Sequence, residues 1–285
     1  MSCRFHPALL VLLFAASPAL AAENWTAKGF EMPESVLFDR AGGRLFVSNI
    51  VGPPDAKDGD GYISVIGLDG AMVTPRFAQG MDAPKGMVLT GGRLYVSDID
   101  KLHAIDPATG AILRTWPAEG AGFLNDLATD GTRVFVSDMA MDRIYVLEDD
   151  ALSVWLESPE LEHPNGLEIS DGKLVVAAWG RGMREDATTE QPGRLLAVDL
   201  ATKAVTPVGT GAPVGNLDGL RPDGAGGWFT TDWIAGGAFH YDAEGEARQV
   251  LELPPGSADL EFMAEKGVIL IPMMLSGEVV ARKID

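Results

Sequence analysis

Cysteine and basic side chains are both scarce in this sequence. The single cysteine, Cys3, stands before an apolar run at 8–22, so a chain cleaved behind that run keeps no thiol. Disulfides and thiol catalysis are therefore excluded for the remainder. Lys and Arg number 22 against 41 Asp and Glu, which gives a net charge of −19. This charge repels phosphate backbones and excludes a nucleic-acid partner, while it would attract cations wherever carboxylates converge.

Histidine is scarce too, and no nucleophile motif stands out. Beyond the apolar run only His103, His163 and His240 remain, far apart in the chain, and they form no zinc ligand set. A G-x-S-x-G segment is missing, which argues against a serine triad. We expect the three imidazoles to be core or surface groups.

Apart from one run near the N-terminus, long apolar stretches are missing. Arg4 precedes ALLVLLFAASPALAA (8–22), whose small residues include Ala-Leu-Ala (19–21). This order is typical of a secretory signal peptide, and the run is too short to span a bilayer comfortably. A buried N-terminal helix is the alternative. We expect residues 1–21 to be a signal peptide and 22–285 to be one domain, exported to the periplasm or secreted, without stable membrane insertion.

What the sequence has in quantity is glycine, 34 residues, with 18 prolines, which favours short strands separated by turns. A unit of several strands recurs six times, about 40 to 50 residues apart, as in propeller blades. The copies begin with PESVLFD (33–39), PKGMVLT (84–90), LNDLATD (124–130), PNGLEIS (164–170), LDGLRPD (217–223) and ADLEFMA (258–264). We predict an all-β, six-bladed β-propeller with four-stranded antiparallel blades. The last copy lacks a fourth strand, and the N-terminal strand at 24–31 would close that blade.

One polar position is shared by all six copies at the start of the first strand. The first strand of each propeller blade lines the channel, so these positions converge at one mouth. They are Glu34, Lys85, Asn125, Asn165, Asp218 and Asp259. Convergent polar groups in a hollow are the default candidate for a binding site, although the channels of other propellers are lined with polar residues as well.

Two loops between second and third strands, at 51–61 and 180–192, are longer than their counterparts. Both are predicted at the same mouth as the polar positions, where long loops on a rigid scaffold often build a site. Trp179, Trp233 and the methionines at 273–274 would form an apolar wall for a small organic ligand, or else cap the core between blades.

Glu34, Asn165 and Asp218 together supply two carboxylates and an amide carbonyl. Hard cations bind such oxygen sets, with water filling the remaining positions. We therefore predict one divalent metal ion, with Ca²⁺ favoured and Mg²⁺, Mn²⁺ or Zn²⁺ as alternatives. Such an ion would polarise a carbonyl and lower the pKa of a bound water. Asn125 and Asp126 would hold substrate or water beside it.

Four segments, PESVLFD, LNDLATD, PNGLEIS and LDGLRPDGAGGWFTTDW, resemble the signature segments of the gluconolactonase, regucalcin and luciferin-regenerating enzyme family. The resemblance covers essentially all of 22–285 in the same order. It implies a six-bladed propeller with one divalent metal in the channel and, in many members, hydrolysis of sugar lactones. By motif, Glu34, Asn165 and Asp218 match the family's metal ligands. Asn125 matches a residue that contacts metal and substrate, and Asp218 would double as the catalytic base.

Two positions depart from the family pattern. Hydrolytic members similar to regucalcin carry an arginine two positions before the motif asparagine, where this chain has Phe123. Lys85 places a cation among the six polar positions at the mouth, where it would pair with Asp259 or Glu34, or recognise an acidic ligand. Phe123 and the loops rich in Met and Trp, Trp233 among them, predict a ligand less polar than a sugar lactone.

Two functions fit these observations. The first is a metal-dependent hydrolase of a lactone or related small ester at the mouth of the channel, with Asp218 as base and Asn125 positioning the substrate. The second is an exported propeller that binds a small molecule or a protein partner at the same face without turnover. Family resemblance alone does not establish an activity. We expect a monomer whose partner is a small-molecule ligand or substrate.

Overall fold

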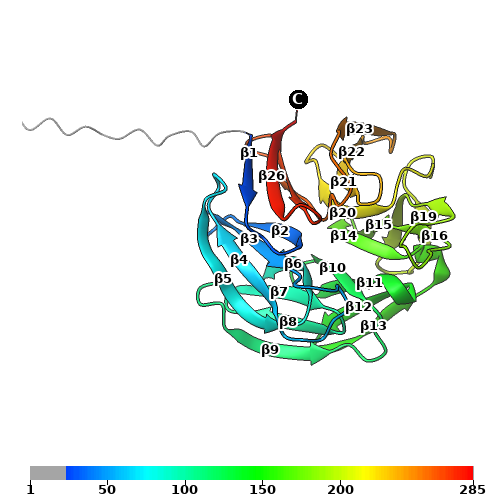
Figure 1. Ribbon diagram of the computed structural model, residues 1–285. Coiled ribbons are helices and arrows are strands. Elements are labelled where there is room, and N and C mark those ends of the chain that lie inside the picture. Colours follow the sequence, from blue (N-terminus) through cyan, green and yellow to red (C-terminus); the bar gives the residue numbers. More distant parts are fainter. Residues whose placement is uncertain (1–23, 285) are drawn as a thin grey trace, which may run out of the picture.

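The computed structural model describes residues 24–284, so the expected signal peptide at 1–21 lies outside the described residues. Six four-stranded antiparallel sheets are arranged around a central axis, which confirms the predicted six-bladed propeller (Figure 1). No helix in the described range is long and apolar enough to cross a membrane.

Each of the first five blades runs in chain order from an inner to an outer strand. Blade 1 comprises β2 (Pro33–Asp39), β3 (Arg44–Asn49), β4 (Gly61–Ile66) and β5 (Met72–Met81). Blade 2 comprises β6 (Pro84–Thr90), β7 (Arg93–Asp98), β8 (Lys101–Ile105) and β9 (Ile112–Pro117). Blade 3 comprises β10 (Leu124–Thr129), β11 (Val134–Asp138), β12 (Arg143–Glu148) and β13 (Ala151–Glu157).

Blade 4 comprises β14 (Pro164–Ser170), β15 (Lys173–Ala178), β18 (Leu195–Asp199) and β19 (Val205–Pro207). Blade 5 comprises β20 (Leu217–Pro222), β21 (Trp228–Asp232), β22 (Ala238–Tyr241) and β23 (Ala247–Leu251). Blade 6 comprises β24 (Glu261–Met263), β25 (Val268–Met273), β26 (Glu278–Lys283) and the N-terminal β1 (Trp25–Lys28). The connections contain a two-stranded ribbon and two short 3₁₀ helices: β16 (Gly180–Arg181), β17 (Gln191–Pro192), η1 (Met139–Met141) and η2 (Pro159–Leu161).

Apolar side chains packed between neighbouring sheets form the core. Between blades 1 and 2, Phe46, Ile63, Met87 and Leu94 are fully buried in one cluster. Each such side chain contributes about 1.5 to 3 kcal/mol when it leaves water. The outer strand β9 is mostly exposed by contrast. The inner strands are therefore buried along most of their length even though they carry polar residues, as in β2 and β10, whereas β9 faces solvent.

The ring of blades is closed by β1, as predicted. It pairs antiparallel with β26, in the register Trp25↔Ala281 to Lys28↔Glu278. The indole Nε1 of Trp25 also donates to the carbonyl of Leu68 in blade 1, at 3.2 Å. The strand β1 therefore covers the edge of β26 and links blade 6 to blade 1.

A β-bulge near the start of the inner strand is shared by five blades. The ladder register shifts directly after the first residue of β2, β6, β10, β14 and β20. Hydroxyls on the second strands accept from the backbone that the bulge frees: Ser48 from Ser35 N–H and Ser137 from Asp126 N–H, both at 2.9 Å. Since bulges re-aim side chains, the second residue of each of these five inner strands turns toward the mouth of the channel.

Candidate functional site

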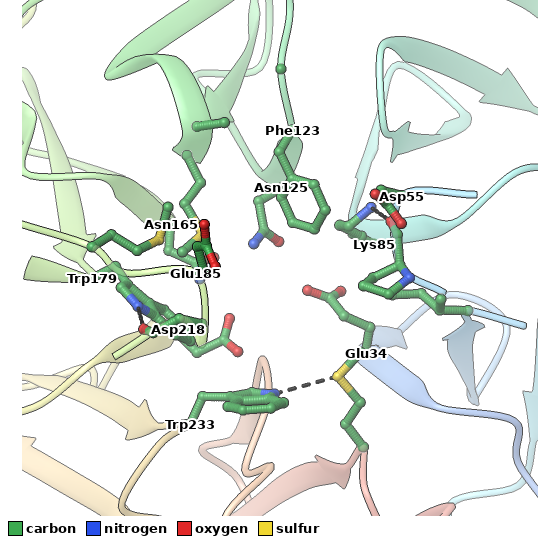
Figure 2. Close-up of a pocket in the computed structure, with 18 of the residues that line it drawn as sticks. Glu34, Asp55, Lys85, Phe123, Asn125, Asn165, Trp179, Glu185, Asp218 and Trp233 are labelled. Atoms are coloured by element: carbon green, nitrogen blue, oxygen red, sulfur yellow. Dashed lines mark hydrogen bonds between the residues drawn. The ribbon is translucent and has the colours of Figure 1, made fainter. Parts of the chain in front are cut away.

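A cavity of about 620 Å³ lies at the mouth of the channel. Four polar side chains from four different blades point toward one another in its lining (Figure 2). They are Glu34 on β2, Asn125 on β10, Asn165 on β14 and Asp218 on β20. These four residues form what we call the acceptor ring. Every residue that the sequence predicted for the metal centre or for catalysis belongs to it.

Each member of the acceptor ring has a buried oxygen that receives no hydrogen bond. The atoms are Glu34 Oε2, Asn125 Oδ1, Asn165 Oδ1 and Asp218 Oδ1. The four residues are between 1% and 5% exposed, so little of each side chain is open to bulk water. A desolvated acceptor without a donor costs about 1 to 3 kcal/mol. Four of them at one place would be satisfied by a ligand that brings hydrogen-bond donors or positive charge.

The two carboxylates of the acceptor ring are crowded by other acids. Burial raises the pKa of Glu34 well above its usual range, and Asp218 and Asp259 raise it further. Burial likewise raises the pKa of Asp218, to which Asp259 and Asp126 add, while a hydrogen bond from Asn165 opposes them. A cation between Glu34 and Asp218 would favour their charged forms and offset both effects.

The donor set fits a hard divalent cation. Two carboxylates and two amide carbonyls are ligands that Ca²⁺ accepts, with further oxygens from water or substrate. Residues 24–284 contain no group of three or more His, Cys, Asp or Glu side chains that could hold a metal, and the acceptor ring has only two such side chains because its other two members are amides. Each of the three histidines has a hydrogen-bond partner elsewhere in the fold: Asp98 for His103, the carbonyl of Met139 for His163 and Asp223 for His240.

Lys85 lines the same cavity but pairs with neither of its predicted partners. Its ammonium donates to the carbonyl of Ala83 at 2.9 Å and to that of Pro54 at 3.4 Å. The nitrogen lies 4.2 Å from the centre of the Phe123 ring, a cation–π contact. Burial lowers the pKa of Lys85 to about 8, although Glu34 and other acids oppose this shift. The prediction of an ion pair with Glu34 or Asp259 is therefore wrong.

Asp259 is not the blade 6 equivalent of Lys85, contrary to the prediction of six equivalent polar positions. The bridge Ser257↔Met273 in blade 6 stands where Pro84↔Asp98 stands in blade 2. The residue equivalent to Lys85 is therefore Ala258, and Asp259 lies one residue later. The predicted alignment of the sixth copy fails because β24 begins only at Glu261, so no long inner strand marks its register.

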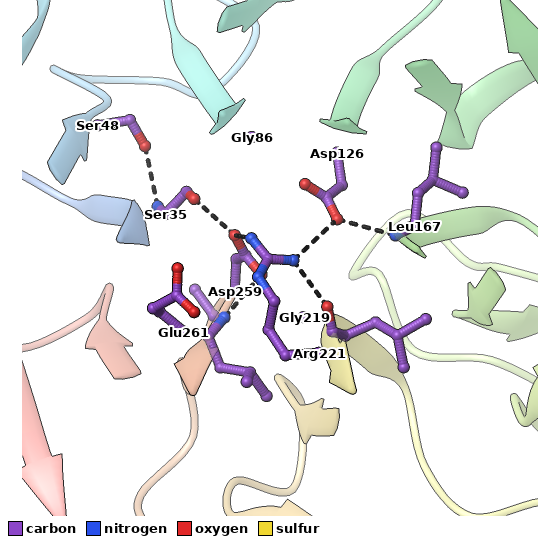
Figure 3. Close-up of polar contacts among 12 residues, drawn as sticks. Ser35, Ser48, Gly86, Asp126, Leu167, Gly219, Arg221, Asp259 and Glu261 are labelled. Carbon is purple, nitrogen blue, oxygen red and sulfur yellow. Dashed lines mark hydrogen bonds and ion pairs between the residues drawn. The ribbon is translucent and has the colours of Figure 1, made fainter. Parts of the chain in front are cut away.

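Asp259 belongs to a second polar cluster, centred on Arg221 (Figure 3). The buried guanidinium lies 3.4 Å from Asp259, 3.7 Å from Glu168 and 3.9 Å from Asp126. The carboxylate of Asp126 also accepts from the Leu167 N–H at 2.8 Å. Asp126, expected to contact substrate, is not among the residues that line the cavity.

Arg221 is the residue that sequence reasoning missed. It stands inside LDGLRPD, a segment chosen for its aspartate, and its contacts reach blades 3, 4 and 6. The available signal is a cation in the middle of a buried inner strand, where lone charges are costly. Such a residue requires carboxylates nearby, but the sequence does not say which ones.

Most of the predicted apolar wall and both long loops meet at the cavity, although Met273 does not line it. Trp179 and Trp233 lie with their ring centres 6.2 Å apart, and the indole of Trp233 donates to the sulfur of Met274 at 3.4 Å. The loop at 51–61 and the loop at 180–192 both contribute lining residues. Phe123 completes an inner surface that is largely apolar around a polar centre.

No family model and no curated protein sequence matches the chain. Among solved structures, a gluconolactonase from Xanthomonas campestris is similar with a TM-score of 0.70 and 16% identity over 100% of both chains. A chain described as a candidate gluconolactonase gives 0.64 and 18% identity over 93% of each chain. A chain from a nidogen/laminin complex gives 0.66 and 16% identity over 85% of this chain and 90% of the other.

These identities are low, so the likeness establishes the fold and leaves the activity to be argued from the site. The nidogen/laminin structure shows that similar folds occur in protein complexes. Gluconolactonases are among the structural neighbours of this chain, which shares their β-propeller fold.

Proposed function

We propose that this chain is a metal-assisted hydrolase that opens a lactone or a related small ester at the mouth of its channel. The acceptor ring is the observation that supports this most: four buried oxygens from four blades converge without donors. Glu34, Asn125, Asn165 and Asp218 would hold one divalent cation, with Ca²⁺ favoured because every ligand is an oxygen. When bound, such an ion supplies Lewis-acid polarisation of a carbonyl group.

The side chains around the centre have complementary tasks in this reaction. In lactone hydrolysis the oxygen of water bonds to the carbonyl carbon, the ring C–O bond breaks and the ring oxygen gains a proton, which leaves a hydroxy acid. Asp218 would accept the proton of the attacking water and return it to the ring oxygen. The amide of Asn125 would donate to the substrate, while Trp179 and Trp233 would hold its carbon skeleton and exclude bulk water.

Metal content decides this proposal first. Residues 22–285 would be purified without a tag and dialysed, and divalent metal per chain would be measured in the parent and in Asp218→Asn. We expect about one metal per chain in the parent and at least a tenfold weaker affinity in the variant. Asp171→Asn, an exposed acid at a turn of blade 4, is the matched control. The rate of hydrolysis of a panel of lactones and esters, measured by proton release, should decrease in parallel with the metal content.

Two outcomes would contradict the proposal. The first is a parent protein that binds no Ca²⁺, Mn²⁺ or Zn²⁺ when these are added. The second is an Asp218→Asn variant that keeps both metal and hydrolysis.

A second candidate, a binding module without turnover, is favoured by Phe123. Its ring stands in the cavity beside Lys85 and offers no hydrogen bond to a substrate. The module would bind a small molecule or a protein partner at the same mouth. Saturable binding with no hydrolysis across the panel would favour it over the hydrolase.

A further inference from the structure

We infer that the ligand of this cavity carries a carboxylate group, which Lys85 binds. The inference rests on the proposed function in one respect, namely that the ligand is then a lactone or small ester with an acid group. The binding of an organic anion by Lys85 does not depend on turnover.

The ammonium of Lys85 has an unused donor at the cavity. Two of its three N–H groups are accounted for by the carbonyls of Ala83 and Pro54. Within residues 24–284 no carboxylate oxygen lies within 4.0 Å of its nitrogen, and no other acceptor is recorded for it. The residue is 1% exposed and lines the cavity (Figure 2). A ligand that enters the cavity therefore meets a buried positive charge with a free donor.

The other buried cation shows what Lys85 lacks. Arg221 has carboxylates at 3.4 Å and 3.7 Å, from Asp259 and Glu168. A buried charge is costly unless a partner of opposite sign is close, because the protein interior solvates it poorly. In the described chain that partner is present for Arg221 and missing for Lys85. A carboxylate from the ligand would take the place that Asp259 has beside Arg221.

The charges around the centre leave room for one organic anion. A divalent cation with Glu34 and Asp218 would be neutral in sum. The other buried acid whose charge acts on Lys85 is Asp98, and its carboxylate is bonded to the N–H groups of Asp82 and Ala83 and to His103. Lys85 therefore has no anion in direct contact. Asp55, Arg184 and Glu185 also line the cavity, but all three are exposed and screened by water and salt.

The remaining lining limits the size and polarity of that anion. Phe123 covers one side of the ammonium at 4.2 Å, and Trp179 and Trp233 form an apolar wall. Such a surface favours a compact acid with an apolar body over a polyhydroxylated sugar, because hydroxyls buried there would find few partners.

Two γ-lactones that differ in one group test the inference in catalysis. 5-Oxotetrahydrofuran-2-carboxylate has a carboxylate where γ-valerolactone has a methyl group. We expect the parent to prefer the acid in kcat/KM, and Lys85→Met to reduce the rate on the acid by about 10- to 100-fold while sparing the neutral lactone, as expected for loss of a charged hydrogen bond. Lys101→Met, which removes a cation of the same blade that pairs with Asp82 outside the cavity, is the matched control. An unchanged preference in Lys85→Met would overturn the inference.

A binding measurement keeps the inference separate from turnover. Phenylacetate and its neutral amide, phenylacetamide, would be titrated while tryptophan fluorescence is followed, because two indoles line the cavity. We expect phenylacetate to bind at least tenfold more tightly in the parent, and this difference to vanish in Lys85→Met and in the more polar Lys85→Gln.

The lactone and binding measurements distinguish failure of the carboxylate inference from failure of the proposed hydrolase function. Lys85-dependent binding of phenylacetate without any lactone hydrolysis would sustain the inference and defeat the hydrolase. Hydrolysis of both lactones alike, unaffected at Lys85, would sustain the hydrolase and defeat the inference. Circular dichroism and the melting temperature of both variants show whether they fold, and a melting temperature within a few degrees of the parent makes their binding data decisive.

Discussion

At the scale of single residues, the acceptor ring is expensive for the folded chain. The carboxylates of Glu34 and Asp218 are buried near other acids, and the amide oxygens of Asn125 and Asn165 have no hydrogen-bond donors. Each feature lowers stability by the cost of an unpaired buried polar group. Residues that lower stability together, at one cavity, are expected where function rather than folding selects them.

Stability should therefore rise when the ring is relieved of a charge. In protein treated with a chelator at pH 8, we expect Asp218→Asn to increase the free energy of unfolding by about 1 kcal/mol, or about 2 °C in melting temperature. The amide keeps the shape but removes repulsion from Glu34, Asp126 and Asp259. Calorimetry measures it, with Asp171→Asn as control. A clear loss of stability would show instead that the carboxylate supports the fold.

Glu168 gives the stability of the fold a dependence on pH with a definite sign. Burial raises its pKa to about 7, partly offset by Arg221. In the unfolded chain its pKa is near the ordinary 4.5, so between pH 4.5 and 7 the folded protein binds more protons and its free energy of unfolding falls as pH rises. Glu168→Gln cannot titrate, and we expect a smaller decline between pH 5 and pH 7.5. Urea unfolding at both pH values measures it; parallel declines would contradict the assignment.

How far single residues could be predicted depends on what fixes them. Glu34 and Asp218 follow from a motif at the start of a strand, whose position the neighbouring turns mark. The partners of Lys85 and Arg221 do not follow, because long side chains reach other blades in ways that depend on the packing of the whole ring. The register of Asp259 does not follow either, because the inner strand of its blade, β24, spans only Glu261–Met263.

At the scale of elements, the inner strands both line the channel and abut one another. The residue after Asn165 is Gly166, and a Cβ there would overlap the carbonyl oxygen of Asp218 in the next blade. Gly219 lies similarly close to the backbone of Asp259. Glycine after Asn165 and after Asp218 therefore lets the inner strands of blades 4, 5 and 6 approach one another closely, and Gly166 does so directly against the backbone of a ring residue. The strands themselves were predictable because glycine and proline turns separate apolar runs.

Gly166→Ala should consequently disturb the acceptor ring from behind. The added methyl group would push the backbone of Asp218 outward, and we expect a loss of about 1 to 3 kcal/mol in stability together with at least a tenfold weaker affinity for Ca²⁺. Titration calorimetry and urea unfolding measure the two effects. Gly43→Ala, where a Cβ meets no atom within 4 Å but φ is +62°, should lower stability without weakening Ca²⁺ binding. Equal affinities in both variants would show that the close approach does not set the ring.

At the scale of the whole molecule, the closure of the circle of blades also fixes the position of the site. Residues from blades 1, 3, 4 and 5 form the acceptor ring, so its geometry requires that the circle of blades stay closed. The number of blades and the closing strand were predictable from the repeat and from the missing fourth strand of the last copy. The cluster around Arg221 was not, because its members are far apart in the sequence and meet only in the closed ring.

Removing β1 tests whether closure holds the molecule together. A chain that begins at Gly29 loses four ladder positions on β26 and the hydrogen bond from Trp25 to Leu68. We expect its free energy of unfolding to fall by about 3 kcal/mol or more, because a large aromatic side chain and a row of strand hydrogen bonds are lost. The freed edge of β26 should also pair between molecules, seen as larger species in size-exclusion chromatography as concentration rises. Trp25→Phe keeps the strand and should cost only about 1 kcal/mol. A deletion variant with the melting temperature and elution volume of the parent would mean that packing between blades 1 and 6 closes the ring without this strand.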